Sequence, residues 1–155
     1  MQSPRASHSW RQVTARSARS AFAIAALTAL VMGCANLRAD APSPDIQTVK
    51  ASAHRLYRVS VRPDVTPIPV RRLQRWTLHL ATIDGQPVDS ATITMDGGMP
   101  QHGHGLPTSP RVTQALGNGD HLIEGVKFNM GGWWVVRFAI TSSAGTDTVS
   151  FNLGL

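Results

Sequence analysis

The sequence predicts an all-β domain, an immunoglobulin-like antiparallel β-sandwich of about seven strands, and three observations lead to this expectation. After residue 54, apolar and polar residues alternate with a period of two in several short segments. No segment in this part competes as a helix with the 3.6-residue period. Glycine- and proline-rich turns separate the alternating segments. Two antiparallel sheets that bury their apolar faces against each other satisfy this pattern.

The first expected strand covers residues 55–61, where Tyr57, Val59 and Val61 lie on one side. The same alternation, or a short apolar run between turns, predicts the remaining strands over residues 76–82, 91–95, 110–116, 121–128, 133–140 and 148–153. Aromatic residues on the apolar faces must fill a core that no disulfide supports. Those expected there are Trp76, Trp134 and Phe138.

Three glycines are expected to shape the connections between these strands. Asp84-Gly85 forms a tight turn, and Gly145 joins the last two strands as a hairpin. Gly125, inside an otherwise strand-like segment, indicates a β-bulge.

Residues 1–33 are expected to be a signal peptide of the lipoprotein type. Residues 1–20 contain four arginines and no acidic residue, and residues 21–33 are uncharged. The apolar run is shorter than the roughly 20 residues that a membrane-spanning helix needs. The segment that ends at Cys34, Val-Met-Gly-Cys, resembles a lipobox. Cys34 would then carry the lipid and become the mature N-terminus, anchored in the membrane.

Ala35, directly after Cys34, resembles a sorting signal for the outer membrane of a Gram-negative cell, so the protein is expected on its periplasmic face. The alternative is an ordinary signal peptide, cut after residues 39–41, that releases a soluble periplasmic protein. Residues 34–53 are rich in Ala, Pro and Ser and are expected to form a flexible tether. Residues 54–155 would then form one domain.

Charge and cysteine content exclude several classes of function. The chain has a net charge of +6, but residues 34–155 hold 11 basic and 9 acidic residues, so the mature chain is only +2. This balance is no argument for binding nucleic acid. Cys34 is the one cysteine of the chain. The domain therefore has no disulfide framework, no cysteine-based zinc site and no thiol nucleophile.

Residues 95–107, with the sequence MDGGMPQHGHGLP, are expected to form a loop that carries the chemistry of the domain. In an extended segment His102 and His104 project to the same side, and Met99 supplies a sulfur three residues earlier. Met130 is a further sulfur donor at the end of a strand. Imidazole suits copper and zinc, whereas thioether prefers Cu(I). We therefore expect a copper site formed by His102, His104 and Met99, with Met130 as an additional candidate.

The alternative is that His102 and His104 hydrogen-bond the loop backbone and fix a long connection. The domain would then be a non-metal interaction module that docks a protein partner in the envelope. Trp133 falls on the outer face of its strand, where it is either an interface anchor or a residue covered by a loop. The oligomeric state stays open as well, because an exposed edge strand permits dimerisation by sheet addition.

No catalytic activity is expected. Ser109, His104 and Asp120 supply the residue types of a catalytic triad, but their spacing lacks a nucleophile elbow. Paired carboxylates and a glycine-rich phosphate loop followed by a helix are also missing from the sequence. The pattern therefore favours a binding domain over an enzyme.

Residues 76–153 resemble the YtkA-like domain family, which is related to FixH-type proteins. The resemblance rests on Met99-Pro100, residues 102–105, Pro107 and residues 130–134. It implies a small extracytoplasmic β-sandwich, tethered as a lipoprotein or by one membrane helix. FixH-type relatives are linked to the assembly of copper-containing respiratory oxidases, so the resemblance implies a copper-related role by analogy. Here the signal and lipobox segment replaces the FixH-type membrane helix, which argues against a role in oxidase assembly.

Overall fold

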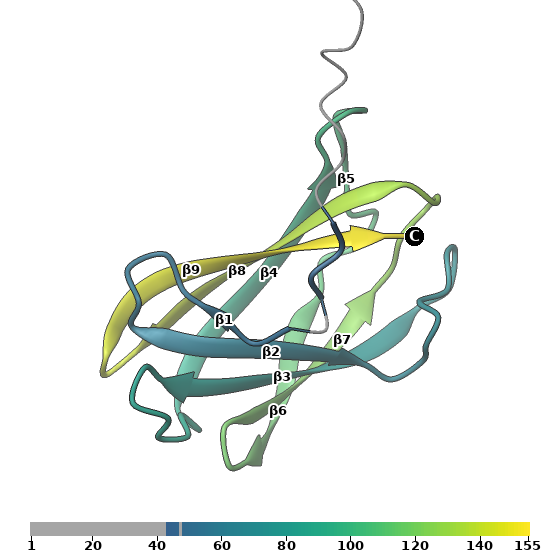
Figure 1. Ribbon diagram of the computed structural model, residues 1–155. Coiled ribbons are helices and arrows are strands. Elements are labelled where there is room, and N and C mark those ends of the chain that lie inside the picture. The colour runs from purple at the N-terminus through teal and green to yellow at the C-terminus, as the bar shows by residue number, and fades with distance from the viewer. Residues whose placement is uncertain (1–42, 47) are drawn as a thin grey trace, which may run out of the picture. The chain divides into compact units, whose positions relative to one another are not determined.

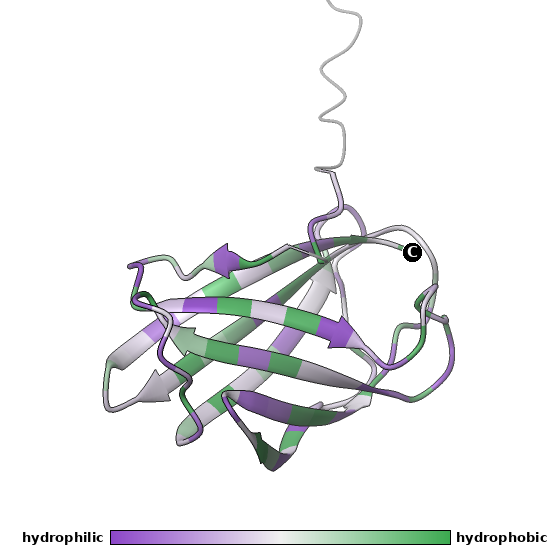
Figure 2. Cartoon of the chain, turned by 60° about the horizontal axis from the view of Figure 1, so that its bottom comes forward, coloured by the Kyte–Doolittle hydropathy of each residue, from purple (hydrophilic) through white to green (hydrophobic). Residues whose placement is uncertain are grey.

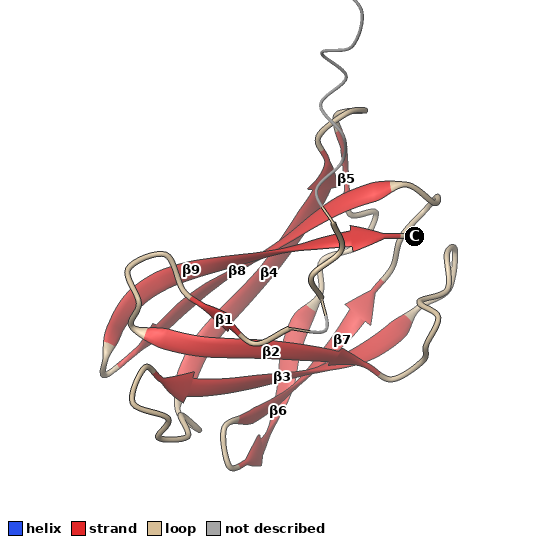
Figure 3. Ribbon diagram, viewed as in Figure 1, coloured by secondary structure: helices blue, strands red, loops and turns tan. Residues whose placement is uncertain are grey.

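The computed structural model describes residues 43–46 and 48–155, so the expected signal peptide, the lipobox and Cys34 lie outside the described residues. Within these residues the chain forms nine strands and no helix (Figure 3). Accordingly, the described part contains no helix that is long and apolar enough to cross a membrane. The all-β prediction is confirmed.

The strands pair antiparallel throughout and form a sandwich (Figure 1). In chain order they are β1 (Lys50–Ala51), β2 (Tyr57–Pro63), β3 (Gln74–Thr82), β4 (Ala91–Met99), β5 (His104–Gly105), β6 (Arg111–Gly117), β7 (Asp120–Val126), β8 (Trp133–Ser142) and β9 (Gly145–Gly154). Hydrogen bonds connect them in the order β1-β2-β3-β7-β6-β4-β8-β9, with β5 paired to β4. A single residue pair, Thr94 with Arg111, joins β4 to β6, so the two halves of the sheet fold over each other.

The core lies between the two halves and is built from the inward-facing residues of each strand. Apolar and polar bands alternate along the strands (Figure 2). Trp76, Trp134 and Phe138 are fully buried, as predicted. Phe128 packs between the two tryptophans, with ring centroids 5.9 Å from Trp76 and 5.1 Å from Trp134. Such aromatic pairs contribute about 1 kcal/mol each beyond their buried area and replace the missing disulfide.

Two glycines extend β4 beyond the strand that the sequence predicts. A Cβ atom on Gly97 would lie 3.1 Å from the Val135 carbonyl oxygen, and one on Gly98 would lie 3.0 Å from the His104 carbonyl oxygen. Because neither glycine has a side chain, both neighbouring segments approach β4 closely. The expectation that residues 95–107 are all loop is therefore wrong in two places: β4 continues to Met99, and His104–Gly105 form the short strand β5.

The expected turns and the expected bulge are confirmed. Gly85 and Gly145 lie at the β3–β4 and β8–β9 turns with φ angles of 89° and 118°. In the β3–β7 ladder Gln74 pairs with Val126 and Trp76 with Ile123, so β7 carries one extra residue near Gly125.

The segment that was expected to be a tether is packed on the domain from residue 43 onward. Ile46 is buried in the core, and β1 pairs with β2. The Asp45 amide donates to the Asn152 carbonyl at 3.0 Å, and the Ala53 amide donates to the Thr148 carbonyl at 2.8 Å. The segment thus covers the free edge of β9. Residues 41–155 form one compact unit that contains every core residue of the described chain, so this range is the natural unit for measurements in solution.

Gly119, in the β6–β7 turn, packs closely against the backbone of β3. Its φ is 79°, and a Cβ atom would lie 2.2 Å from the Leu80 carbonyl oxygen. We expect Gly119→Ala to lower the free energy of unfolding by about 3 kcal/mol or more. Gly85→Ala is the matched control, because φ is 89° but nothing lies within 4 Å of the added Cβ, and it should cost about 1–2 kcal/mol. Urea unfolding measures both. Equal losses would show that the contact with Leu80 is unimportant.

Candidate metal centre

The β4–β5 hairpin extends at one end of the sandwich and carries three of the four predicted metal ligands (Figure 1). Its turn, residues 100–103, is fixed by the backbone. The Met99 carbonyl oxygen accepts hydrogen bonds from the His102 amide at 3.0 Å and the Gly103 amide at 2.9 Å. Gly103 has a φ of 65°, which lets the chain reverse without strain. The position of the histidines therefore follows from the turn and needs no side-chain contact.

Both histidines are exposed and lie side by side. The ring centroids of His102 and His104 are 6.3 Å apart, and the ring planes differ by 23°. The sequence predicts this proximity for an extended segment, but the structure achieves it differently, because His102 lies in the turn and His104 in β5. Among the described histidines, those at positions 54, 79 and 121 hydrogen-bond protein groups, whereas the rings of His102 and His104 do not. Their ring nitrogens are available to a ligand.

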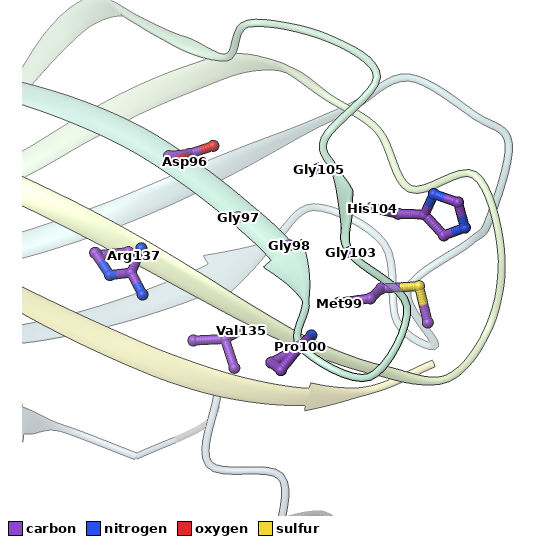
Figure 4. Close-up of a pocket in the computed structure, with 10 residues that line it drawn as sticks. All are labelled: Asp96, Gly97, Gly98, Met99, Pro100, Gly103, His104, Gly105, Val135 and Arg137. Carbon is purple, nitrogen blue, oxygen red and sulfur yellow. The ribbon is translucent and has the colours of Figure 1, made fainter.

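Met99 and His104 form a cross-strand pair between β4 and β5. Residues directly opposite each other share one face of an antiparallel ladder, with Cβ atoms about 5 Å apart. Both side chains accordingly extend to the same side of the hairpin (Figure 4). The Met99 side chain is buried, and its terminal methyl carbon would lie only 2.8 Å from a Cβ atom on Gly132. The hairpin thus combines a thioether held by the core with an imidazole open to solvent.

Met130 lies in the β7–β8 loop, residues 127–132, and its side chain is 41% exposed. Its carbonyl oxygen accepts a hydrogen bond from the Trp134 indole at 3.1 Å, which fixes the backbone of the loop. Gly132, two residues further on, is the residue that covers the Met99 methyl group. The structure therefore gathers Met99, His102 and His104 on one hairpin and places Met130 on the adjoining loop.

Gly132 was missed by reasoning from the sequence, although the Gly-Gly pair at residues 131–132 is a signal for a close approach of two backbones. Trp133, the next residue, lies on the outer face as expected, is half-buried and donates its indole N–H to the Asn152 side chain at 3.1 Å. This polar group is therefore satisfied inside the domain and is not offered to a partner.

An open groove of about 320 Å³ runs along the hairpin. Met99 and His104 belong to its lining, together with Pro100, the hairpin glycines and three residues of β4 and β8, namely Asp96, Val135 and Arg137 (Figure 4). Asp96 stands directly across from Arg137 in the β4–β8 ladder, so the two charges offset each other. The groove consequently gives no preference for a charged ligand, and its distinctive chemistry comes from Met99 and His104.

The donor set limits which metal fits. In the described part of the chain, no three His, Cys, Asp or Glu side chains are placed to hold one metal ion. Structural zinc sites use four such ligands, and calcium and magnesium require oxygen donors. Two imidazoles with a thioether instead suit copper, above all Cu(I). The residues present therefore fit copper better than the harder or strictly tetrahedral metals.

These features define a small antiparallel β-sandwich domain with a hairpin of histidine and methionine at one end. The YtkA-like family model matches residues 54–139, more than half of the chain, and the chain therefore belongs to the YtkA-like family. The resemblance to the YtkA-like family is thus confirmed, over residues 54–139 in place of 76–153, and the match includes the hairpin and the β7–β8 loop. Family membership indicates an extracytoplasmic accessory domain. No curated protein and no solved structure is significantly similar to the chain.

Proposed function

We propose that this chain is an exported, lipid-anchored domain of the cell envelope that binds copper and acts as a metallochaperone-like accessory protein without catalytic activity. The observation that supports this most directly is the pairing of Met99 with His104 across the β4–β5 ladder, with the His102 ring beside it. Sulfur and imidazole nitrogen form a neutral, soft donor set that prefers Cu(I).

The surroundings of the donors suit a carrier that must also release its metal. Met99 is held by core packing and by the β7–β8 loop, so the sulfur is preorganised. His102 and His104 are exposed, which leaves them accessible to a recipient. A set without thiolate holds copper less firmly than cysteine ligands do, which favours transfer.

A second function, a protein-interaction module that binds no metal, remains the competing proposal. It draws on the same exposed hairpin and on Trp133, but the Trp133 indole is half-buried and bonded to Asn152. The backbone hydrogen bonds of the turn also make a scaffold role for the imidazoles unnecessary. A Trp133→Ala variant that retains every partner captured by the wild-type chain would count against this module.

The test of copper binding is a titration of residues 41–155 with Cu(I) and with Cu(II) in competition with chelators of known affinity. We expect one equivalent of Cu(I) to bind with a dissociation constant below about 1 nM, and Cu(II) to bind more weakly. Binding no stronger than the background of the competitor would overturn the proposal and leave the interaction module as the better reading of the hairpin.

A further inference from the structure

Two loops adjoin at one end of the sandwich, and together they form what we call the basic end, residues 62–75 and 127–132. The first segment contains the β2–β3 loop, and the second is the β7–β8 loop. The Arg71 amide donates to the Phe128 carbonyl at 2.6 Å, and the Arg71 guanidinium donates to the Asn129 carbonyl at 3.4 Å. These contacts hold the two loops side by side.

Exposed apolar side chains concentrate at the basic end. Six large hydrophobic residues are exposed in the described part of the chain, and four of them belong to these two segments. They are Val65 at 45%, Val70 at 38%, Leu73 at 68% and Met130 at 41% exposure. Single exposed apolar residues are ordinary, but a concentration of them in adjoining loops marks a surface that contacts something else.

Positive charge concentrates at the same place. The basic end holds five basic residues (Arg62, Arg71, Arg72, Arg75 and Lys127) and one acidic residue, Asp64. Over the rest of residues 34–155, six basic residues are outnumbered by eight acidic ones. The mature chain therefore divides into a basic end of +4 and a remainder of −2. A surface with this character is complementary to anionic groups.

The β2–β3 loop is held in shape before any contact is made. The Gln74 side-chain amide donates to the Pro69 carbonyl at 3.2 Å, and the Arg75 guanidinium lies 3.6 Å from the Asp64 carboxylate. Together with the bonds of Arg71, these contacts leave Arg72 and Leu73 exposed on a fixed backbone. A preordered loop loses little conformational entropy when it docks.

The N-terminal segment approaches the domain at this same end. Pro44 and Ile46 line a hollow together with Thr66, Pro67 and Ile68 of the β2–β3 loop. From Cys34 to residue 43 the chain has nine residue steps, which span at most about 30 Å at roughly 3.5 Å each. A lipid on Cys34 would therefore keep residue 43, next to the hollow that the β2–β3 loop lines, within about 30 Å of the bilayer.

We propose that the basic end docks on the headgroups of anionic phospholipids in the membrane that holds the anchor. Arginines would contact phosphate, and Leu73 with its exposed apolar neighbours would enter the interface. The docking rests on the lipid anchoring in the proposed function. It also adds to it, because the Met130 loop is part of the docked surface and the copper hairpin would be held close to the membrane.

Vesicle flotation with residues 41–155, free of metal and without the lipid, tests this directly. We expect the protein to float with vesicles of phosphatidylglycerol and phosphatidylcholine, and not with phosphatidylcholine alone. Each basic residue near an anionic surface strengthens binding about fivefold, so Arg72→Glu with Leu73→Glu should weaken it by about tenfold or more. Arg58→Glu with Leu116→Glu, the same change of charge and side chain outside the basic end, should leave it unchanged.

Equal losses in the two double variants, or no flotation of the wild-type chain with anionic vesicles, would overturn the proposal. Binding to polyglutamate without binding to vesicles would overturn it too, and would assign the basic end to an acidic protein partner. The Cu(I) titration is run on the same variants. A wild-type chain that binds Cu(I) but does not float refutes the docking proposal alone, whereas a wild-type chain that floats but does not bind Cu(I) refutes the proposed function alone.

Discussion

Replacing His102 and His104 together by alanine is expected to lower the affinity for Cu(I) and Cu(II) by about 100-fold or more, a loss of about 3 kcal/mol in binding free energy. Both rings are exposed and hydrogen-bond no protein group in the described chain, so their loss should change the free energy of unfolding by less than about 0.5 kcal/mol. Chelator competition and urea unfolding on the same preparation measure the two quantities.

Met99→Leu is expected to separate the two oxidation states. Leucine fills nearly the same volume, so the core and the contact with Gly132 persist at a cost below about 1.5 kcal/mol. Cu(I) affinity should fall by at least about tenfold because the thioether is lost, whereas Cu(II) affinity, which depends on the imidazoles, should change little. Met95→Leu is the matched control: Met95 is also buried on β4 and faces the same core.

The control decides how the result is understood. If Met95→Leu lowers Cu(I) affinity as much as Met99→Leu does, the effect comes from disturbance of β4 and not from a lost ligand.

The other two variants have their own outcomes. If the double histidine variant unfolds, the imidazoles are structural, and the hairpin is a scaffold for a protein surface. Met130→Leu then shows whether the β7–β8 loop contributes a fourth donor, since its side chain is exposed and its loss should not affect folding.

Local patterns predict most of the sandwich. Residues 133–140 and 148–153 alternate because each strand separates the core from solvent, and the structure extends them only slightly, to β8 and β9. The burial of Trp76 and Trp134 follows from the same alternation. Sequence reasoning works here because the signal is carried by neighbouring residues.

The hairpin shows where local reasoning ends. Residues 102–104 place two imidazoles close together in any compact turn, so that part of the site is predictable. The strand character of Gly97 and Gly98 is not, because it depends on how closely β5 and β8 approach their backbone. Nor does any local signal show that Met99 packs under Gly132, a residue 33 positions later in the chain.

The N-terminal segment presents the same limitation. Its Ala, Pro and Ser content predicts a tether, yet from residue 43 it packs along β9, at the other end of the sequence. Backbone hydrogen bonds to Asn152 and Thr148 hold it there. Two carboxylates add to them: Asp45 of the segment accepts from the Asn152 amide, and Asp147 of β9 accepts from the amide of His54, 93 positions earlier. Contacts at such separation leave no periodic trace in the sequence.

Asp147 is expected to be the polar residue on which the stability of this packing depends most. Its side chain is fully buried and accepts hydrogen bonds from the amides of His54 at 2.9 Å, Leu56 at 3.3 Å and Thr148 at 2.8 Å. Burial alone would raise the pKa of Asp147, but hydrogen bonds from Ser52, Thr148, His54 and Leu56 outweigh it and hold the pKa well below its usual range.

Asp147→Asn should therefore lower the free energy of unfolding at pH 7 by about 3 kcal/mol. The variant removes the charge that these N–H groups face and introduces an amide group with donors of its own. Urea unfolding at pH 7 measures the loss. Asp84→Asn, in the β3–β4 turn, is the matched control because Asp84 is exposed, and we expect a change of less than about 0.5 kcal/mol.

The pH dependence gives an independent test of the cause. The pKa of Asp147 is lower in the folded chain than the value of about 3.9 in the unfolded chain. Its contribution to stability is therefore complete above about pH 5 and is lost as the pH falls below about 4 toward the folded pKa. The wild-type chain should lose stability over this range more steeply than Asp147→Asn, so that the two curves converge in acid. Parallel curves would mean that the variant acts by disturbing the shape of the site, and that the carboxylate charge is not what holds residues 52–56 against β9.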